Sequence, residues 1–145
     1  MFRDFANNIA DDQVVDPVVI SADADGSSVD LKNYDGGVTF LALVGASGDE
    51  LSGSVYVELE VEESADDSTF TDVADADLVG YVAGNNDGCF AVIDAPAEDD
   101  AVYKCHYRGN KRYVRPVINV TGTHTNGIPI GIVALRLGAK NKPVS

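Results

Sequence analysis

Residues 54–62 alternate between apolar and polar side chains at almost every position, and this regularity restricts the fold more than any other feature. Successive side chains of a β-strand point to opposite faces, so the pattern predicts a strand with one core side and one solvent side. The core side holds Val55, Val57, Leu59 and Val61. The solvent side holds Tyr56, Glu58, Glu60 and Glu62.

Clusters of glycine, asparagine, aspartate and serine separate further strand-like segments about every 8–12 residues. This spacing predicts an all-β fold, a single antiparallel β-sandwich or barrel of the jelly-roll or immunoglobulin-like kind. We expect this domain at residues 17–138, between a short N-terminal arm at 1–16 and a C-terminal tail at 139–145. Residues 38–45 are apolar on both sides, which predicts a strand that is buried on two faces or covered by another subunit.

Residues 103–116 predict a β-hairpin in which Gly109-Asn110 forms a two-residue turn. This register pairs Cys105 with Val114 on a core face and His106 with Tyr113 on the opposite face. That opposite face holds Lys104, His106, Arg108, Lys111, Tyr113 and Arg115. Because directly opposed like charges destabilise a sheet, we expect an acidic surface to cover it.

The charged residues are segregated along the chain. Residues 1–100 contain all 24 acidic residues and two basic ones, a formal charge of −22, whereas residues 101–145 carry +8. Two electrostatically complementary regions follow from this distribution. The basic strands either lie beside acidic strands of the same fold or meet the acidic row Glu58, Glu60 and Glu62 of another subunit.

The N-terminal arm places Phe2, Phe5 and Ile9 at the spacing of one face of a short helix. So short an arm either lies against its own domain or docks on a neighbour. The first residues lack the pattern of a secretory signal, and no apolar run reaches the length of a membrane span. We therefore expect a soluble protein without a membrane partner.

The sequence offers no recognisable catalytic motif. It lacks a Gly-x-Ser-x-Gly elbow, a phosphate-binding P-loop and a Gly-x-Gly-x-x-Gly fingerprint followed by a helix. We expect a protein that is not an enzyme and has no cofactor. The basic and aromatic residues near the predicted hairpin could bind nucleic acid, but the charge of −22 elsewhere would repel phosphates, so we expect no nucleic-acid partner.

Two groups of residues could bind a metal ion, but each has a simpler interpretation. Cys89 and Cys105 are expected as free buried thiols, with a disulfide, or zinc bound together with His106 and His124, as the alternatives. The acidic segment at residues 23–30 could bind calcium, but it lacks the later glutamate of an EF-hand loop. A turn rich in aspartate is the simpler interpretation of that segment, so no metal site is predicted.

Several segments resemble one family of proteins. They are Arg3-Asp4 with Asn7-Asn8-Ile9, Asp75-Ala76-Asp77-Leu78-Val79-Gly80, and Gly109-Asn110-Lys111-Arg112-Tyr113-Val114-Arg115. The chain resembles small β-rich proteins encoded among the head-morphogenesis genes of tailed bacteriophages, and the last segment is the most specific. The resemblance implies a virion protein that decorates or cements the outside of a capsid, assembled in the host cytoplasm. Its partners would be the major capsid protein and further copies of itself, for example in a trimer.

The residues expected at these interfaces combine the arm with the basic face. They are Phe2, Phe5, Ile9, Lys104, Arg108, Lys111, Arg112, Tyr113 and Arg115. Two other functions stay open at this point. One is a head–tail connector or tail component, and the other is a carbohydrate-binding β-sandwich, although the chain has no tryptophan for a sugar platform.

Overall fold

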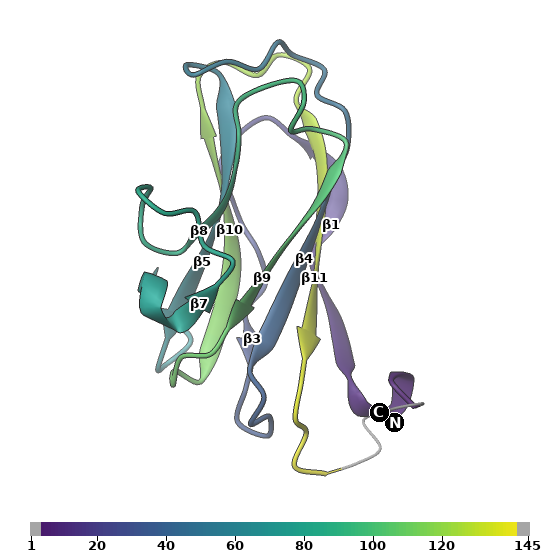
Figure 1. Ribbon diagram of the computed structural model, residues 1–145, viewed down its shortest axis with the longest axis vertical. Helices are drawn as coiled ribbons and strands as arrows, with labels where there is room; N and C mark the ends of the chain where they lie inside the picture. Colours follow the sequence, from purple (N-terminus) through teal and green to yellow (C-terminus); the bar gives the residue numbers. More distant parts are fainter. Residues whose placement is uncertain (1–3, 142–145) are drawn as a thin grey trace.

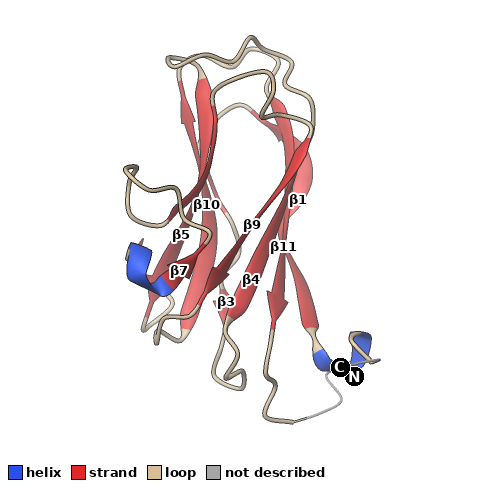
Figure 2. Cartoon of the chain, in the orientation of Figure 1, coloured by secondary structure: helices blue, strands red, loops and turns tan. Residues whose placement is uncertain are grey.

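The computed structural model describes residues 4–141 and consists of two antiparallel β-sheets packed face to face (Figures 1 and 2). Sheet A has the strand order β1 (Ala10–Ile20), β11 (Ile128–Arg136), β4 (Val38–Val44), β9 (Ala101–Tyr107) and β7 (Leu78–Val79). In sheet B, β2 (Ala24–Asp25) and β3 (Val29–Asp30) pair with β10 (Tyr113–Thr121), which pairs with β5 (Tyr56–Ser64). The strands β6 (Thr71–Asp72) and β8 (Cys89–Ile93) pair with the far side of β5.

The predicted all-β sandwich is confirmed, and the sheets do not close into a barrel. Only the short 3₁₀ turns η1 (Ala6–Asn8) and η2 (Asp75–Asp77) are helical among residues 4–141. No helix in this described part is long and apolar enough to cross a membrane.

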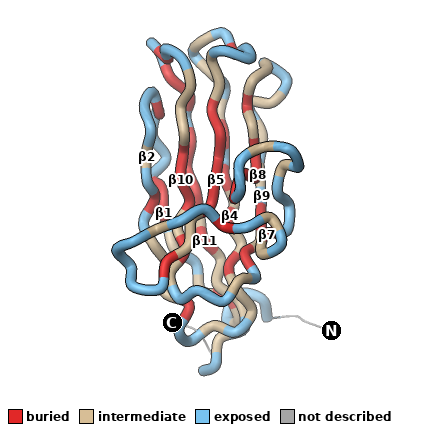
Figure 3. Tube along the Cα trace, turned by 90° about the vertical axis from the view of Figure 1, so that its left-hand side faces the viewer, coloured by how far each residue is buried: buried red, intermediate tan, exposed pale blue. Residues whose placement is uncertain are grey.

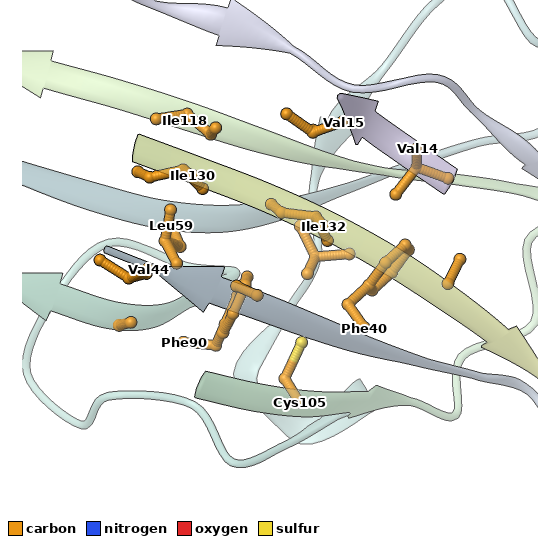
Figure 4. Packing of buried hydrophobic residues seen from close by; sticks show 14 of the residues in the cluster. Val14, Val15, Phe40, Val44, Leu59, Phe90, Cys105, Ile118, Ile130 and Ile132 are labelled. Atoms are coloured by element: carbon orange, nitrogen blue, oxygen red, sulfur yellow. The ribbon is translucent and has the colours of Figure 1, made fainter. Parts of the chain in front are cut away.

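The core lies between the two sheets, and Figure 4 shows side chains from both of them meeting there. On β5, Val57, Leu59 and Val61 are completely buried, as the alternation predicted. On β4, Phe40 is completely buried and opposes them from sheet A. Figure 3 shows the buried positions running along the middle of the strands, with exposed residues in the connections.

Both ends of the domain differ from the predicted boundaries. Strand β1 begins at Ala10 and pairs with β11, so residues 10–16 belong to the sheet rather than to the arm. The register of β1 shifts twice between Gln13 and Val18, which accommodates Pro17 at an edge of the sheet. At the other end, Ala139 bridges to Tyr34, so the start of the predicted tail lies against the domain.

The predicted hairpin at residues 103–116 is wrong. Strand β9 pairs with β4 and β7 in sheet A, whereas β10 pairs with β5 in sheet B, so residues 108–112 connect the two sheets. Neither Gly109 nor Asn110 has the positive φ that a primed hairpin turn requires. His106, expected opposite Tyr113, instead pairs with Thr39 and its Nδ1 lies 2.9 Å from the hydroxyl oxygen of that residue.

The connection is built around the side chain of Tyr107. Its ring is completely buried, its hydroxyl donates to Oε2 of Glu63 at 2.6 Å, and the backbone N–H of Lys111 donates to the hydroxyl at 3.0 Å. A Cβ added at Gly109 would lie 2.5 Å from the same hydroxyl oxygen. Glycine is therefore needed at position 109 for close approach to the tyrosine rather than for a hairpin turn.

Candidate interaction surface

The arginines at positions 112 and 115 pair with carboxylates of their own chain. Arg112 makes two hydrogen bonds to the carboxylate of Asp30, at 2.9 and 2.6 Å. Arg115 forms ion pairs with Glu62 at 2.7 Å, its neighbour across the β5–β10 ladder, and with Asp25 at 2.9 Å. For these two arginines, the acidic surface that the sequence required lies in the same fold.

Other cations of the candidate set are placed differently. The guanidinium of Arg108 donates to the carbonyl oxygen of Ala76 at 2.9 and 3.1 Å, which fastens the sheet connection to η2. Tyr113 is half-buried, with the guanidinium of Arg112 4.7 Å from its ring centre. Lys104 and Lys111 are exposed and have no carboxylate partner among residues 4–141.

The hydrogen bonds from Arg112 change the pKa of Asp30. The hydrogen bond lowers the pKa of this carboxyl from 3.8 to about 2. A lowered pKa in the folded state stabilises the fold above the ordinary value of 3.8, and this contribution disappears as the pH falls towards 2. Because both side chains are about two-fifths exposed, solvent screening keeps the contribution of the pair small.

We expect Arg112→Gln to return the pKa of Asp30 towards its ordinary range. The free energy of unfolding should fall by less than about 1 kcal/mol at pH 6, and the difference from the wild type should vanish near pH 2. Carbon-detected NMR titration of the Asp30 carboxyl, with urea unfolding at both pH values, measures the two effects. An unchanged Asp30 titration in the variant would contradict this assignment.

The described part of the arm does not present Phe5 and Ile9 together. Phe2 lies outside the described residues, Phe5 is 62% exposed, and Ile9 is only 7% exposed. Ile9, predicted as an interface residue, is instead buried by its own domain, which is the other placement that the sequence allows. The sequence could not decide this, since the spacing of apolar residues is the same for a free and a packed arm.

The acidic row of β5 also differs from its prediction. Glu62 pairs with Arg115, whereas Glu58 and Glu60 are 8% and 5% exposed and cannot meet another subunit as an open row. Burial raises the pKa of Glu60, and burial raises the pKa of the neighbouring Cys89 thiol to about 11. The alternation of β5 cannot reveal this burial, because Asn86 and Asn119, the partners of Glu60, come from other parts of the chain.

Neither the zinc site nor the calcium site considered from the sequence is formed among the described residues. Cys89 lies in sheet B and Cys105 in sheet A, both as free buried thiols, and neither histidine joins them. In the aspartate-rich turn, Asp30 binds Arg112 and Asp25 binds Arg115. These carboxylates therefore serve as partners of arginine within the fold.

The outer face of sheet A is apolar and exposed. Leu43 of β4 pairs with Val102 of β9 on one side and with Gly131 of β11 on the other, so they form one row across the sheet. The side chains of Leu43 and Val102 are 53% and 64% exposed. The next row, Lys104, Leu41 and Val133, includes one charge. The two apolar sides of residues 38–45 therefore differ in burial. Phe40 points into the core, whereas Leu43 points outward.

The apolar face continues into a shallow groove beside β1. The groove has a volume of about 400 Å³ and is lined by β1, β4 and β11. Val19 of β1, the register partner of Pro129, lies on the outer side of sheet A and is 54% exposed. Gly131 has no side chain, and a Cβ added there would lie 3.2 Å from the Cα of Pro17. The backbone of β1 can therefore approach β11 closely at this point of the groove. We define the outer apolar face by Val19, Leu43, Val102 and Gly131.

No protein-family model matches this chain, and no curated protein matches it significantly.

Proposed function

We propose that this chain is a non-enzymatic structural protein of a virion, which decorates a tailed-phage capsid by docking its outer apolar face on the shell. The observation that supports the proposal most is the exposure of that face. Contiguous apolar surface on a soluble domain marks a site of interaction with another protein. The resemblance of the segment 109–115 to phage head proteins supplies the identity of the partner, the major capsid protein.

The size of the face favours a shell over a second free copy of the chain. Four long strands spaced about 4.8 Å apart, and roughly seven residues long, cover about 450 Å² in projection. A stable complex of two proteins usually buries about 800 Å² on each partner. On a capsid, copies bound side by side can add contacts that a free pair would lack, and such multivalent attachment strengthens weak individual interfaces.

Self-association on the shell is part of the same proposal, with a trimer as one arrangement. Lys104 and Lys111 have no carboxylate partner in the described part, whereas the chain as a whole carries a formal charge of −14. Lysine contacts with carboxylates of a neighbouring copy would weaken with added salt. Native mass spectrometry across a salt series tests this part, and a monomer under all conditions would overturn it without affecting docking on the shell.

The function itself is tested by the composition of purified particles. We expect quantitative mass spectrometry of gradient-purified virions to find the chain in many copies, at a fixed ratio to the major capsid protein. A count that suits a single ring would favour the head–tail connector or tail component. Complete absence from the particles would overturn the proposal.

The carbohydrate-binding alternative has less support from the surface. Sugar platforms are built from exposed aromatic rings, whereas the outer apolar face is aliphatic. Tyr81, which is 43% exposed, lies in the connection between β7 and β8 and not on that face. A screen against a glycan array would detect this function.

A further inference from the structure

Three side chains with metal-binding chemistry are buried together on the outer side of sheet B. Glu58 and Glu60 project from the same side of β5, because they are two residues apart on one strand. Cys89 of β8 is the register partner of Glu60. A carboxylate oxygen from each glutamate and Sγ of Cys89 all lie within 4.8 Å of one another.

A loop from later in the chain covers this cluster. Residues 80–88 leave β7, turn at Gly84 and Gly88, and return into β8, on the left in Figure 1. From this loop, the amide of Asn85 donates to Sγ of Cys89 at 3.4 Å and that of Asn86 to Oε1 of Glu60 at 3.4 Å. From β10, the amide of Asn119 donates to Oε2 of Glu60 at 2.6 Å. Glu60 and Cys89 are therefore held by residues of both strand and loop.

The buried negative charge of the cluster has no protein cation to balance it. Within residues 4–141, neither Glu58 nor Glu60 forms an ion pair, and the carboxylate of Glu58 accepts no hydrogen bond. Yet Glu58 is more than nine-tenths buried and faces the other two groups. An ionised carboxylate without a partner is costly to bury, and a second one beside it adds repulsion. A bound cation would remove both penalties.

We propose that Glu58, Glu60 and Cys89 bind one zinc ion. Zinc accepts sulfur and carboxylate oxygen together in a four-coordinate site, whereas calcium and magnesium require oxygen ligands alone. Three protein ligands leave the fourth position to water or to another oxygen. On binding, the thiol of Cys89 loses its proton to solvent, since the thiolate is the ligand.

The site would fasten β8 to β5. Cys89 is the first residue of β8, and Glu58 and Glu60 belong to β5, so the ion would connect these two strands at the point where residues 80–88 end. The hydrogen bond from Asn119 would hold Glu60 in its ligating orientation, as second-shell donors commonly do. This role is independent of the proposed docking on a capsid, which uses the opposite sheet.

Zinc chloride and cobalt chloride, titrated into the full-length reduced protein, test the site. We expect one zinc ion per chain by calorimetry, a higher midpoint of thermal unfolding, and a thiolate-to-cobalt charge-transfer band in the near ultraviolet. Glu58→Gln and Cys89→Ala should each weaken zinc affinity at least about tenfold. Cys89→Ala should also remove the cobalt band.

The second cysteine supplies a matched control. Cys105→Ala removes an equally buried thiol from the other sheet and should leave both zinc affinity and the cobalt band unchanged. Circular dichroism confirms that each variant is folded, and the near-isosteric Glu58→Gln still tests the site where Cys89→Ala fails to fold. Absence of the cobalt band in the wild type, or equal zinc affinity in the wild type and Glu58→Gln, would overturn the proposal and indicate adventitious binding by surface carboxylates.

Discussion

Replacing Tyr107 by alanine is expected to lower the free energy of unfolding by about 3–5 kcal/mol, the cost of deleting a large buried aromatic side chain. The ring is completely buried beneath the connection between the two sheets. Its hydroxyl bonds both Glu63 of β5 and the backbone of Lys111, so its removal also leaves two polar groups without their partner. The substitution therefore affects both the core and the crossing between sheets.

Urea unfolding of three variants separates these contributions. Tyr107→Phe keeps the ring and should cost about 1–3 kcal/mol for the unsatisfied partners alone. Tyr81→Ala removes an exposed tyrosine and should change stability by about 0.5 kcal/mol or less. If Tyr107→Ala were no more destabilising than Tyr81→Ala, the structural role assigned to this residue would be wrong.

Replacing Leu43 by aspartate should greatly weaken binding to capsids while leaving the fold intact. The side chain lies at the middle of the outer apolar face and is 53% exposed, so a charge there meets water in the free protein. In the docked state the carboxylate would be buried against the shell without a partner. A buried charge without a partner costs about 2 kcal/mol or more, so we expect affinity to fall by roughly thirtyfold or more.

Co-sedimentation with capsids stripped of the protein measures this loss. Tyr81→Asp introduces the same charge at an exposed apolar residue outside the face, and it should bind like the wild type. Equal binding of the Leu43 variant and the wild type would exclude the outer apolar face as the docking surface.

The strand pattern predicted the fold class because burial in a sandwich follows the period of the strand. Along β5, the alternation correctly identified Val57, Leu59 and Val61 as core residues. The hairpin prediction failed because alternation reports which face of a strand is buried and not which strand lies beside it. Cys105 and Val114 are both buried as expected, but in different sheets that face each other.

The surface features were predictable only where they depend on a single strand. The two-sided apolar pattern of residues 38–45 allowed either burial on both faces or a cover from another subunit, and the 53% exposure of Leu43 excludes burial of that face by the described residues. The pairing of Arg115 with Glu62 needed the order of strands, which local sequence does not contain. The hydrogen bond from Asn86 to Glu60 needed the path of the loop at residues 80–88, and alternation alone placed Glu58 and Glu60 in solvent.

Electron cryomicroscopy of the intact particle tests the central claim most directly. We predict that the reconstruction shows the sandwich on the outside of the capsid, with Leu43 and Val102 of sheet A against the shell and sheet B turned away from it. Particles whose density accounts for every protein without this chain, or a bound sandwich with Leu43 and Val102 facing solvent, would contradict the account.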